Sequence, residues 1–320
     1  QPLAALPALS TLANAVFALS PYVAAFRFQH QDEALHWAVA DRFPAAAHLR
    51  EKSARVGWAT DTLDDVNGVA TTIRAAAALA RERGLAVTVL ASLPAAPRVD
   101  FDLENFPPIF ERPLPRYEHL ALRVPPFAEL VEAVERERFR ELVVSTPGPM
   151  GLAALAAGKL LGLRLTGIYH TDFPRYVGAF GGDARLTGHA WSYLRWFYGQ
   201  MDRVLVSSRA YFEELAERGF DPTRLALLPR GVDAERFHPR HRQADFFIRR
   251  GLAAGTTLLY VGRLAPEKNL EVLLEAFAGV AARRPELSLA LVGDGPHRAE
   301  LERRAGERVH FIGFLEGAEL

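Results

Sequence analysis

Two cations in one short segment are the side chains of this sequence best suited to hold an anion. Arg263 and Lys268 lie in VGRLAPEK (261–268), which follows a predicted strand and contains a turn-forming proline. Lysine is rare in the chain, since only Lys52 and Lys159 accompany Lys268. A fork-shaped guanidinium and a compact ammonium that reach one anion suit a pyrophosphate leaving group. The spacing therefore predicts a diphosphate site, and the alternative is a pair of solvated surface cations.

Two segments that join a predicted strand to a helix could bring backbone N–H groups to the same kind of ligand. In TDTLDDVNGVATT (60–72), Asn67 and Gly68 let the backbone approach a ligand closely, and the helix N-terminus behind them favours a diphosphate. STPGPMG (145–151) combines two glycines with what we expect to be an open helix start. Ordinary turns have the same composition, so each segment alone is weak support for a site.

A histidine follows one of the predicted strands directly. His170 belongs to YHTDFP (169–174), and ligands of parallel sheets bind at the carboxyl ends of the strands. This position favours a role as hydrogen-bond partner or electrostatic stabiliser over a purely structural one. Other patterns are interpreted as chance or packing, and no metal site is predicted from them: Asp-x-Asp at 100–102, His238 with His241, GDGPHR at 293–298 and the aromatic run 191–198. Gly-x-Ser-x-Gly, the mark of a serine hydrolase, is absent.

The elements that must position these residues alternate regularly from residue 55 onward. Short β-branched runs separated by Ala/Leu/Arg-rich stretches are typical of βαβ units and a parallel sheet. We expect strands at 55–59, 86–90, 141–145, 165–169, 203–207, 224–228, 257–261, 287–292 and 309–312. We expect helices at 69–83, 127–139, 150–161, 189–200, 209–218, 269–283 and 297–305. The proline-rich stretch 94–126 is predicted to be a long loop.

Two Rossmann-like domains in tandem follow from this alternation, which places the chain in the α/β class. Residues 55–235 form the first domain, 236–256 a linker and 257–320 an incomplete second domain, behind an N-terminal extension over 1–54. The chain stops in mid-pattern, so we expect the natural protein to continue past Leu320.

The N-terminal stretch 1–26 contains no charged residue. Its length could span a bilayer, but prolines interrupt it and no basic region precedes it, which argues against a signal peptide. A membrane or interfacial segment and the tail of an upstream domain are the two interpretations left open.

The composition excludes several classes of protein. Hydrophobic residues make up 49% of the 320 residues and charged residues 24%, as in a globular protein with a sizeable core. The 38 basic and 38 acidic side chains balance, so no net field favours nucleic acid. Cysteine is absent, which excludes thiol catalysis and Cys-based zinc sites.

Taken in order, the segments from about residue 55 to 320 resemble glycosyltransferase family 4, whose members have the two-domain GT-B fold. The resemblance rests on TDTLDDVNGVATTI, STPGPMGLAAL, YHTDFPRY, VSS at 206–208, LPRGVDAERFHP, YVGRLAPEKNLEVLLEAF, LVGDGPHRAELE and VHFIGFL. YHTDFP is similar to the branch with sulfoquinovosyl and mannosyl transferases that make glycolipids.

The resemblance implies a retaining transfer of a hexosyl group from a nucleotide-diphosphate sugar to an acceptor hydroxyl. It places Gly68 against the donor diphosphate, His170 against the transferred sugar, and Arg263 with Lys268 at the departing diphosphate, so that no metal or other cofactor is required. It also implies positions for the other candidate residues. Asp294 and Gly295 would lie near the nucleotide, Phe314 and Leu315 around its base, and Asn67 and Asp172 on the acceptor side.

The partners implied are a nucleotide sugar and an acceptor glycolipid, glycan or polyol, with no nucleic acid. The resemblance also implies that the protein is cytoplasmic, with a peripheral contact at the inner face of the membrane.

The resemblance places the family's Glu-x7-Glu element, which helps to hold the donor, after the point where this sequence ends. We therefore expect the parent protein to be a glycosyltransferase and the 320-residue chain itself to be inactive or nearly so. The alternative is a GT-B-like module that binds a nucleotide or glycan without turnover. A dinucleotide-dependent oxidoreductase would need G-x-G-x-x-G after the first strand, and TDTLDDVNGV does not supply it.

Overall fold

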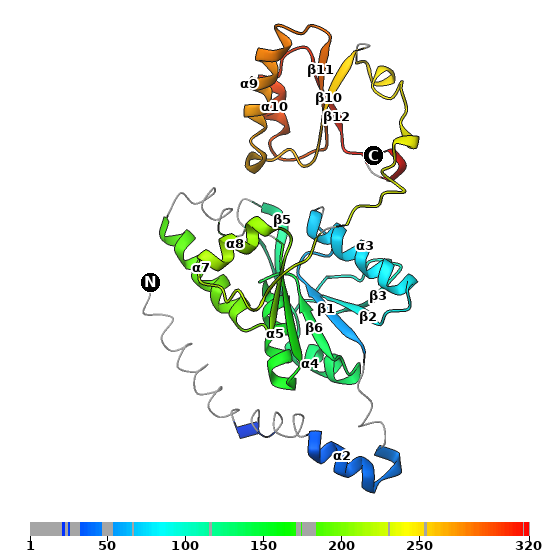
Figure 1. Ribbon diagram of the computed structural model, residues 1–320, viewed down its shortest axis with the longest axis vertical. Helices are drawn as coiled ribbons and strands as arrows, with labels where there is room; N and C mark the ends of the chain where they lie inside the picture. Colours follow the sequence, from blue (N-terminus) through cyan, green and yellow to red (C-terminus); the bar gives the residue numbers. More distant parts are fainter. Residues whose placement is uncertain are drawn as a thin grey trace. The chain divides into compact units, whose positions relative to one another are not determined.

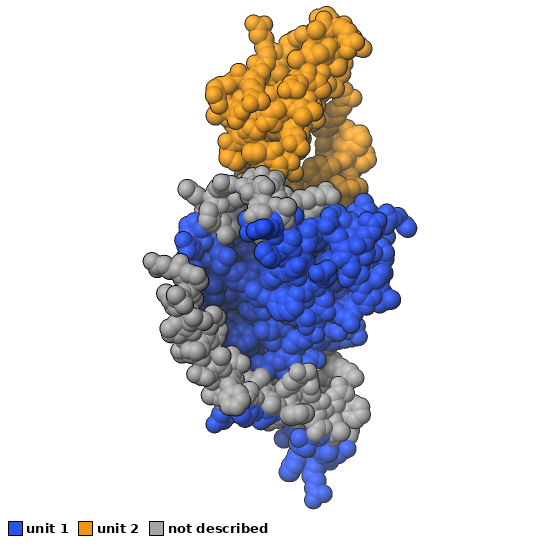
Figure 2. Space-filling model, turned by 90° about the vertical axis from the view of Figure 1, so that its left-hand side faces the viewer, with its two compact units in different colours: residues 1–230 blue, residues 231–320 orange. Residues whose placement is uncertain are grey.

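The computed structural model describes the chain in two compact units, residues 1–230 (unit 1) and 231–320 (unit 2), shown in Figures 1 and 2. The described residues are 21–22, 25, 33–46, 54–65, 67–114, 117–170, 174, 184–229, 231–252, 255–315 and 317–319. The uncharged stretch 1–26 lies almost wholly outside them. Among the helices of the described residues, none has the length and apolar character needed to cross a membrane.

Unit 1 contains a seven-stranded parallel sheet with the order β3-β2-β1-β6-β7-β8-β9. Its strands are β1 (Val56–Thr60), β2 (Val87–Ala91), β3 (Asp102–Asn105), β6 (Glu141–Val144), β7 (Arg164–Tyr169), β8 (Arg203–Val206) and β9 (Leu225–Leu227). The chain builds outward from β1 in one direction and then, from β6, in the other. The carboxyl ends of β1 and β6 therefore form a topological switch point, where open α/β sheets bind their ligands.

Helices cover both faces of this sheet, as Figure 1 lets the reader follow. They are α3 (Gly68–Glu82), α4 (Phe127–Arg136), α5 (Pro149–Leu161), α7 (Ala184–Gly199) and α8 (Arg209–Glu217), while α2 (Glu33–Arg42) precedes the sheet. Within β2, Leu90 packs in the core cluster of α4, α5, α7 and α8, whereas Val89 and Ala91 pack in the cluster of α3. Because successive strand residues point to opposite faces, α3 lies on the face opposite the other four helices.

The segment predicted to be a loop contains structure of its own. Besides edge strand β3, it forms the antiparallel hairpin of β4 (Phe110–Leu114) and β5 (Tyr117–Val124). The two strands, FERPL and YEHLALRV, form a small separate sheet of their own. Neither has the continuous apolar run by which a buried strand is recognised in a sequence. The loop prediction over 94–126 was therefore wrong for these residues.

Unit 2 has a parallel sheet of three strands in the order β10-β11-β12. The strands are β10 (Thr256–Val261), β11 (Leu287–Val292) and β12 (Val309–Gly313), and the helices are α9 (Leu270–Ala281) and α10 (Arg298–Arg304). Every residue of the central strand β11 is buried, and α9 and α10 lie on the same side of the sheet in Figure 1. Short 3-10 turns complete the unit: η3 (Pro239–His241), η4 (Ile248–Arg250), η5 (Pro266–Lys268) and η6 (Gly317–Glu319).

The predicted strands and helices are confirmed, with ends that differ by a few residues. The largest shift is at α7, which begins at Ala184 rather than at 189.

Close backbone packing at the start of α5 gives a first prediction. A Cβ added to Gly151 would overlap the carbonyl oxygen of Thr146, whereas one added to Gly188, in α7, would meet no atom within 4 Å. Gly151→Ala should lower the free energy of unfolding by about 1–3 kcal/mol, because backbone must move to admit the methyl group. Gly188→Ala should raise it by up to about 1 kcal/mol, the gain of alanine over glycine in a helix.

Urea denaturation followed by circular dichroism measures both values. Equal effects of the two substitutions would contradict the close approach at Gly151.

Candidate active site

At the switch point of unit 1, the side chain of Asp61 joins the end of β1 to the start of α5. Its Oδ1 accepts a hydrogen bond from the backbone N–H of Met150 at 2.7 Å, and its Oδ2 accepts one from that of Gly151 at 3.3 Å. Thr146 donates its hydroxyl proton to Oδ2, and its Oγ1 accepts from the backbone N–H of Asp61 at 2.9 Å. The N-cap residue of α5 is Gly148, which has no side chain to cap the helix. The expectation of an open helix start at 145–151 was therefore wrong, because a carboxylate from another loop occupies it.

The surroundings of Asp61 change its proton affinity and that of a neighbour. Burial raises the pKa of Asp61 above its usual value, although the hydrogen bonds from Thr146, Met150 and Gly151 oppose this shift. Tyr193 of α7 donates to the carbonyl oxygen of Pro147 at 2.5 Å. Burial, and then the charge of Asp61, raise the pKa of Tyr193 to about 12, so its hydroxyl keeps its proton at neutral pH.

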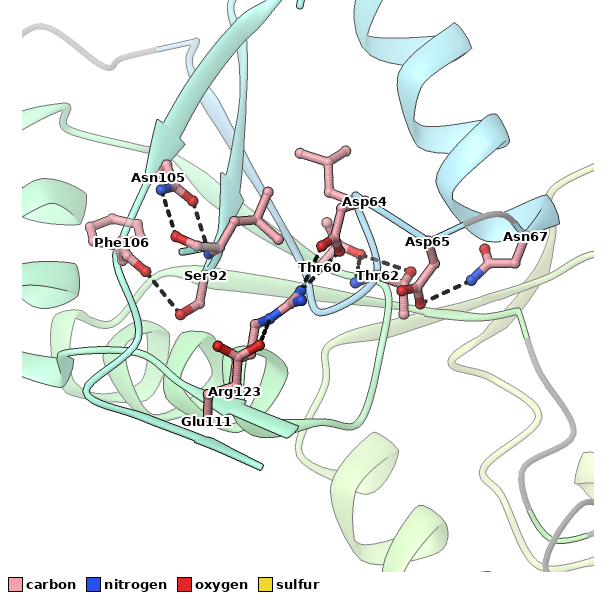
Figure 3. Close-up of polar contacts among 12 residues, drawn as sticks. Thr60, Thr62, Asp64, Asp65, Asn67, Ser92, Asn105, Phe106, Glu111 and Arg123 are labelled. Atoms are coloured by element: carbon pink, nitrogen blue, oxygen red, sulfur yellow. Dashed lines mark hydrogen bonds and ion pairs between the residues drawn. The ribbon is translucent and has the colours of Figure 1, made fainter. Parts of the chain in front are cut away.

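Asn67 and Gly68 lie at the start of α3, as the sequence predicted. Asn67 is the N-cap, and its Oδ1 accepts from the N–H groups of Val69 and Ala70, both at 2.9 Å. Its Nδ2 donates to Asp65 Oδ2 at 3.2 Å, as Figure 3 shows. The first N–H groups of this helix are therefore satisfied by a side chain, and a ligand at Gly68 would have to share or replace that cap.

The loop before α3 is braced by a residue that the sequence analysis missed. Arg123, on β5, donates from Nη1 to both carboxylate oxygens of Asp64 at 2.9 Å and from Nε to Glu111 Oε1 at 2.9 Å (Figure 3). Only 15% of the Arg123 side chain is exposed. The β4–β5 hairpin is thus tied to the β1–α3 loop. No motif marks Arg123, and only knowledge of the hairpin register could have found it.

His170 follows the last residue of β7, where the sequence placed it, and is partly buried. Its strand neighbours β6, so His170 lies at the same sheet edge as Thr146. Asn67 comes from the far side of β6, because β1 and β7 flank that strand. The other predicted residue of this loop, Asp172, lies outside the described residues.

In unit 2 the loops after the three strands are bonded to one another. The N–H of Leu264 donates to the carbonyl oxygen of Asp294 at 2.9 Å, and the N–H of His297 donates to that of Leu264 at 3.0 Å. The N–H of Gly293 donates to the carbonyl oxygen of Gly313 at 2.8 Å. The residues predicted after β10, β11 and β12 are therefore brought to one edge of the sheet.

Two glycines make this close approach possible. Gly293 and Gly295 have φ values of +137° and +159°. A Cβ at Gly293 would overlap the carbonyl oxygen of Gly262, and one at Gly295 would overlap that of Leu264. The glycines of GDG thus serve loop packing, whatever ligand the edge binds.

The predicted donor residues differ in exposure along this edge. Lys268 is exposed at the end of η5 and has no carboxylate partner within the described residues, and Arg263 is partly buried. Asp294 is exposed and lies 3.5 Å from the guanidinium of Arg298. Phe314 is 55% exposed, and Leu315 is partly buried beside it.

The polar groups around the cations are largely fixed. Tyr260 donates its hydroxyl proton to the carbonyl oxygen of Arg263 at 3.0 Å, and burial, followed by the charge of Glu267, raises the pKa of that tyrosine. No group of three or more His, Asp or Glu side chains suited to a metal ion occurs in the part of the chain that the structure describes. The chemistry that this edge offers is the binding of an anion by a guanidinium and an ammonium.

The raised pKa of Asp61 predicts a pH-dependent contribution to stability. Because the folded-state pKa lies above the unfolded value near 3.8, the contribution is fully present below that value and is lost as the pH rises through the folded-state pKa. The stability of wild type relative to Asp61→Asn should therefore fall over this window. Urea denaturation of both proteins between about pH 3 and pH 8 measures the difference.

Asp221 provides a control of opposite sign. Hydrogen bonds from Thr223 lower its pKa, so its contribution is present above the unfolded value and is lost as the pH falls through the folded-state pKa. The free energy of unfolding of wild type, relative to that of Asp221→Asn, should therefore increase as the pH rises. Profiles that run parallel for wild type and Asp61→Asn would contradict the burial of an ionisable Asp61.

The chain is similar in sequence to several known glycosyltransferases. A sulfoquinovosyl transferase of Arabidopsis thaliana is 32% identical over 65% of this chain and 41% of its own length. A GDP-mannose-dependent alpha-mannosyltransferase of Mycobacterium tuberculosis is 33% identical over 65% of this chain and 53% of its own length. An alpha-monoglucosyldiacylglycerol synthase of Streptococcus pneumoniae is 25% identical over 83% of this chain and 62% of its own length. The chain thus spans about half the length of these relatives.

Among solved structures, Anabaena HepE in complex with UDP and glucose matches 82% of this chain and 70% of its own chain, with a TM-score of 0.60 and 17% identity. The fold is α/β of the GT-B class, with two Rossmann-like units. The model of Glycosyl transferases group 1 matches residues 255–320, and that of Glycosyltransferase Family 4 matches residues 66–236, more than half of the sequence. This chain belongs to Glycosyltransferase Family 4.

Proposed function

We propose that the protein transfers a hexosyl group from a nucleotide-diphosphate sugar to an acceptor hydroxyl, with retention of the anomeric configuration. The observation that carries the proposal is the edge of unit 2, where the segment with Arg263 and Lys268 is bonded to the loop that holds Asp294 and Gly295. Family membership supplies the reaction class. Inactivity of the 320-residue chain by itself stays a prediction.

The chemistry that these residues would perform is electrostatic. Breaking the bond between sugar and diphosphate develops negative charge on the departing phosphate oxygens. Arg263 and Lys268 would neutralise this charge as it appears, which lowers the barrier more than ground-state binding does. We therefore propose that transfer requires no metal ion.

The remaining predicted residues would orient the donor and the acceptor. Asp294 and Gly295 would lie near the nucleotide, with Phe314 and Leu315 around its base. His170 would stabilise the transferred sugar. Gly68 would approach the diphosphate, and Asn67 and Asp172 would lie on the acceptor side.

A glycolipid acceptor is supported by the name of one relative, the alpha-monoglucosyldiacylglycerol synthase of Streptococcus pneumoniae. We propose that the acceptor is a lipid; a glycan and a polyol are the alternative classes of acceptor. We also propose that the protein works in the cytoplasm, at the inner face of the membrane. Leu186 and Trp196 of α7, 51% and 52% exposed, are apolar groups that could enter a lipid surface, since tryptophan is enriched at membrane interfaces.

The donor proposal predicts nucleotide binding that depends on the two cations. Isothermal titration of the chain with UDP and with GDP should detect binding of at least one nucleotide. Arg263→Ala and Lys268→Ala should each weaken that binding by about 10- to 100-fold, the loss of a charge-assisted hydrogen bond. Lys159→Ala, which removes an exposed lysine in the last turn of α5, should leave it unchanged.

Addition of EDTA should also leave the affinity unchanged. Unaltered binding by Lys268→Ala would remove this residue from the site, and binding of neither nucleotide would contradict the donor proposal as a whole.

Peripheral membrane contact predicts flotation with vesicles. The full chain should float with vesicles of anionic phospholipid, and removal of residues 1–54 should reduce the floating fraction if the uncharged stretch contributes. Leu186→Ser with Trp196→Ser tests α7 in the same assay. The proposal of membrane contact is wrong if neither the full chain nor the shortened chain floats.

A further inference from the structure

His297 connects both ends of the segment that carries the two cations. Its backbone N–H donates to the carbonyl oxygen of Leu264 at 3.0 Å, and its Nε2 lies 2.9 Å from Glu271 Oε1. Leu264 directly follows Arg263, and Glu271 lies in the first turn of α9, just beyond Lys268. One residue of the β11–α10 loop therefore contacts the chain just after Arg263 and again just after Lys268.

The side chain of His297 is buried, with 7% of the residue exposed. Its Nε2 also lies 3.3 Å from Oε2 of Glu300, a residue of α10. Its Nδ1 is buried and has no hydrogen-bond partner among the residues that the structure describes. With carboxylate oxygens near Nε2, the ring nitrogen that carries a proton must be Nε2, which donates to Glu271. A hydrogen bond to an ionised group is stronger than one between neutral groups, so this contact ties the start of α9 to the β11–α10 loop.

The cation-bearing segment, residues 263–269, contains a turn closed by backbone hydrogen bonds. Within it, the N–H of Lys268 donates to the carbonyl oxygen of Ala265 at 3.0 Å, and the N–H of Asn269 donates to that of Pro266 at 3.1 Å. Asn269 has a φ of 49°, a left-handed conformation that a non-glycine residue adopts at a cost. The packing around the turn must therefore hold it in place.

We infer that His297 is a positioning residue, which holds the Arg263–Lys268 segment in the conformation that binds the donor diphosphate. It does so through Glu271 and Leu264 and without touching the ligand. This inference rests on the proposed function for its consequence in binding, whereas the mechanical role can be measured without a ligand.

The mechanical role is tested by hydrogen exchange of the backbone amides. His297→Leu keeps the volume and removes the donor, so the amides of 263–269 should exchange faster than in wild type, while those of β11 remain protected. His297→Gln keeps an N–H donor toward Glu271 and should restore slow exchange. Glu300→Gln alters the contact within α10 alone and should leave exchange over 263–269 unchanged.

The consequence for binding is tested by a double-substitution cycle with UDP and GDP as probes. His297→Leu should weaken binding about 10-fold, and His297→Gln should bind as wild type does. If His297 acts through the placement of the cations, His297→Leu should cost little further affinity in the Lys268→Ala background. A residue that merely stabilises the fold would give additive losses.

Each outcome separates the two proposals. Unchanged exchange over 263–269 in His297→Leu, or fully additive losses of affinity, would overturn the inference. If wild type binds neither nucleotide, the proposed function fails while the exchange data still decide the positioning role. If His297→Leu does not fold, Glu271→Gln weakens the same contact with a smaller change, and the same faster exchange is expected.

Discussion

The carboxyl edge of unit 1 depends on one buried carboxylate. Asp61 directly follows β1, and its side chain reaches the N-terminus of α5, where it accepts from two backbone N–H groups that the helix leaves unsatisfied. The switch point of the sheet, between β1 and β6, is thereby closed by a buried carboxyl group. Asp61 can approach the helix this closely only because residues 148 and 151 are glycines. A Cβ at Gly148 would overlap the Asp61 carboxyl group, and one at Gly151 would overlap the carbonyl oxygen of Thr146.

Unit 2 joins its strand ends by backbone hydrogen bonds and not by a buried carboxyl group. Gly293 and Gly295 let the loop after β11 pass directly over the carbonyl groups of the loop after β10, and backbone hydrogen bonds hold the two together. Behind this contact, the side chain of His297 meets that of Glu271. The two units therefore solve the same problem, the convergence of loops at the carboxyl ends of parallel strands, in different ways.

The sequence predicted the features that depend on residues close together in the chain, and it missed those that join distant residues. The alternation of β-branched and helical stretches predicted the elements, because strand and helix patterns are local. The positions of Asn67 and His170 followed from their place after a strand. The cap by Asp61 and the brace by Arg123 did not, because each joins residues far apart in the chain. One hint was present: α5 begins at Gly-Pro without a capping side chain of its own, so its cap had to come from elsewhere.

The capping pattern bears on where an anion can bind. In unit 1 the first N–H groups of α3 and α5 are satisfied by Asn67 and Asp61, and replacing such a cap costs about 1 kcal/mol or more. In unit 2 no side chain caps α9, and a lysine with no carboxylate partner among the described residues precedes it. Under the proposed function, a diphosphate would therefore gain more from the uncapped helix start and exposed lysine of unit 2 than from the capped helix starts of unit 1, where Gly68 would have to share the N-terminus of α3 with Asn67.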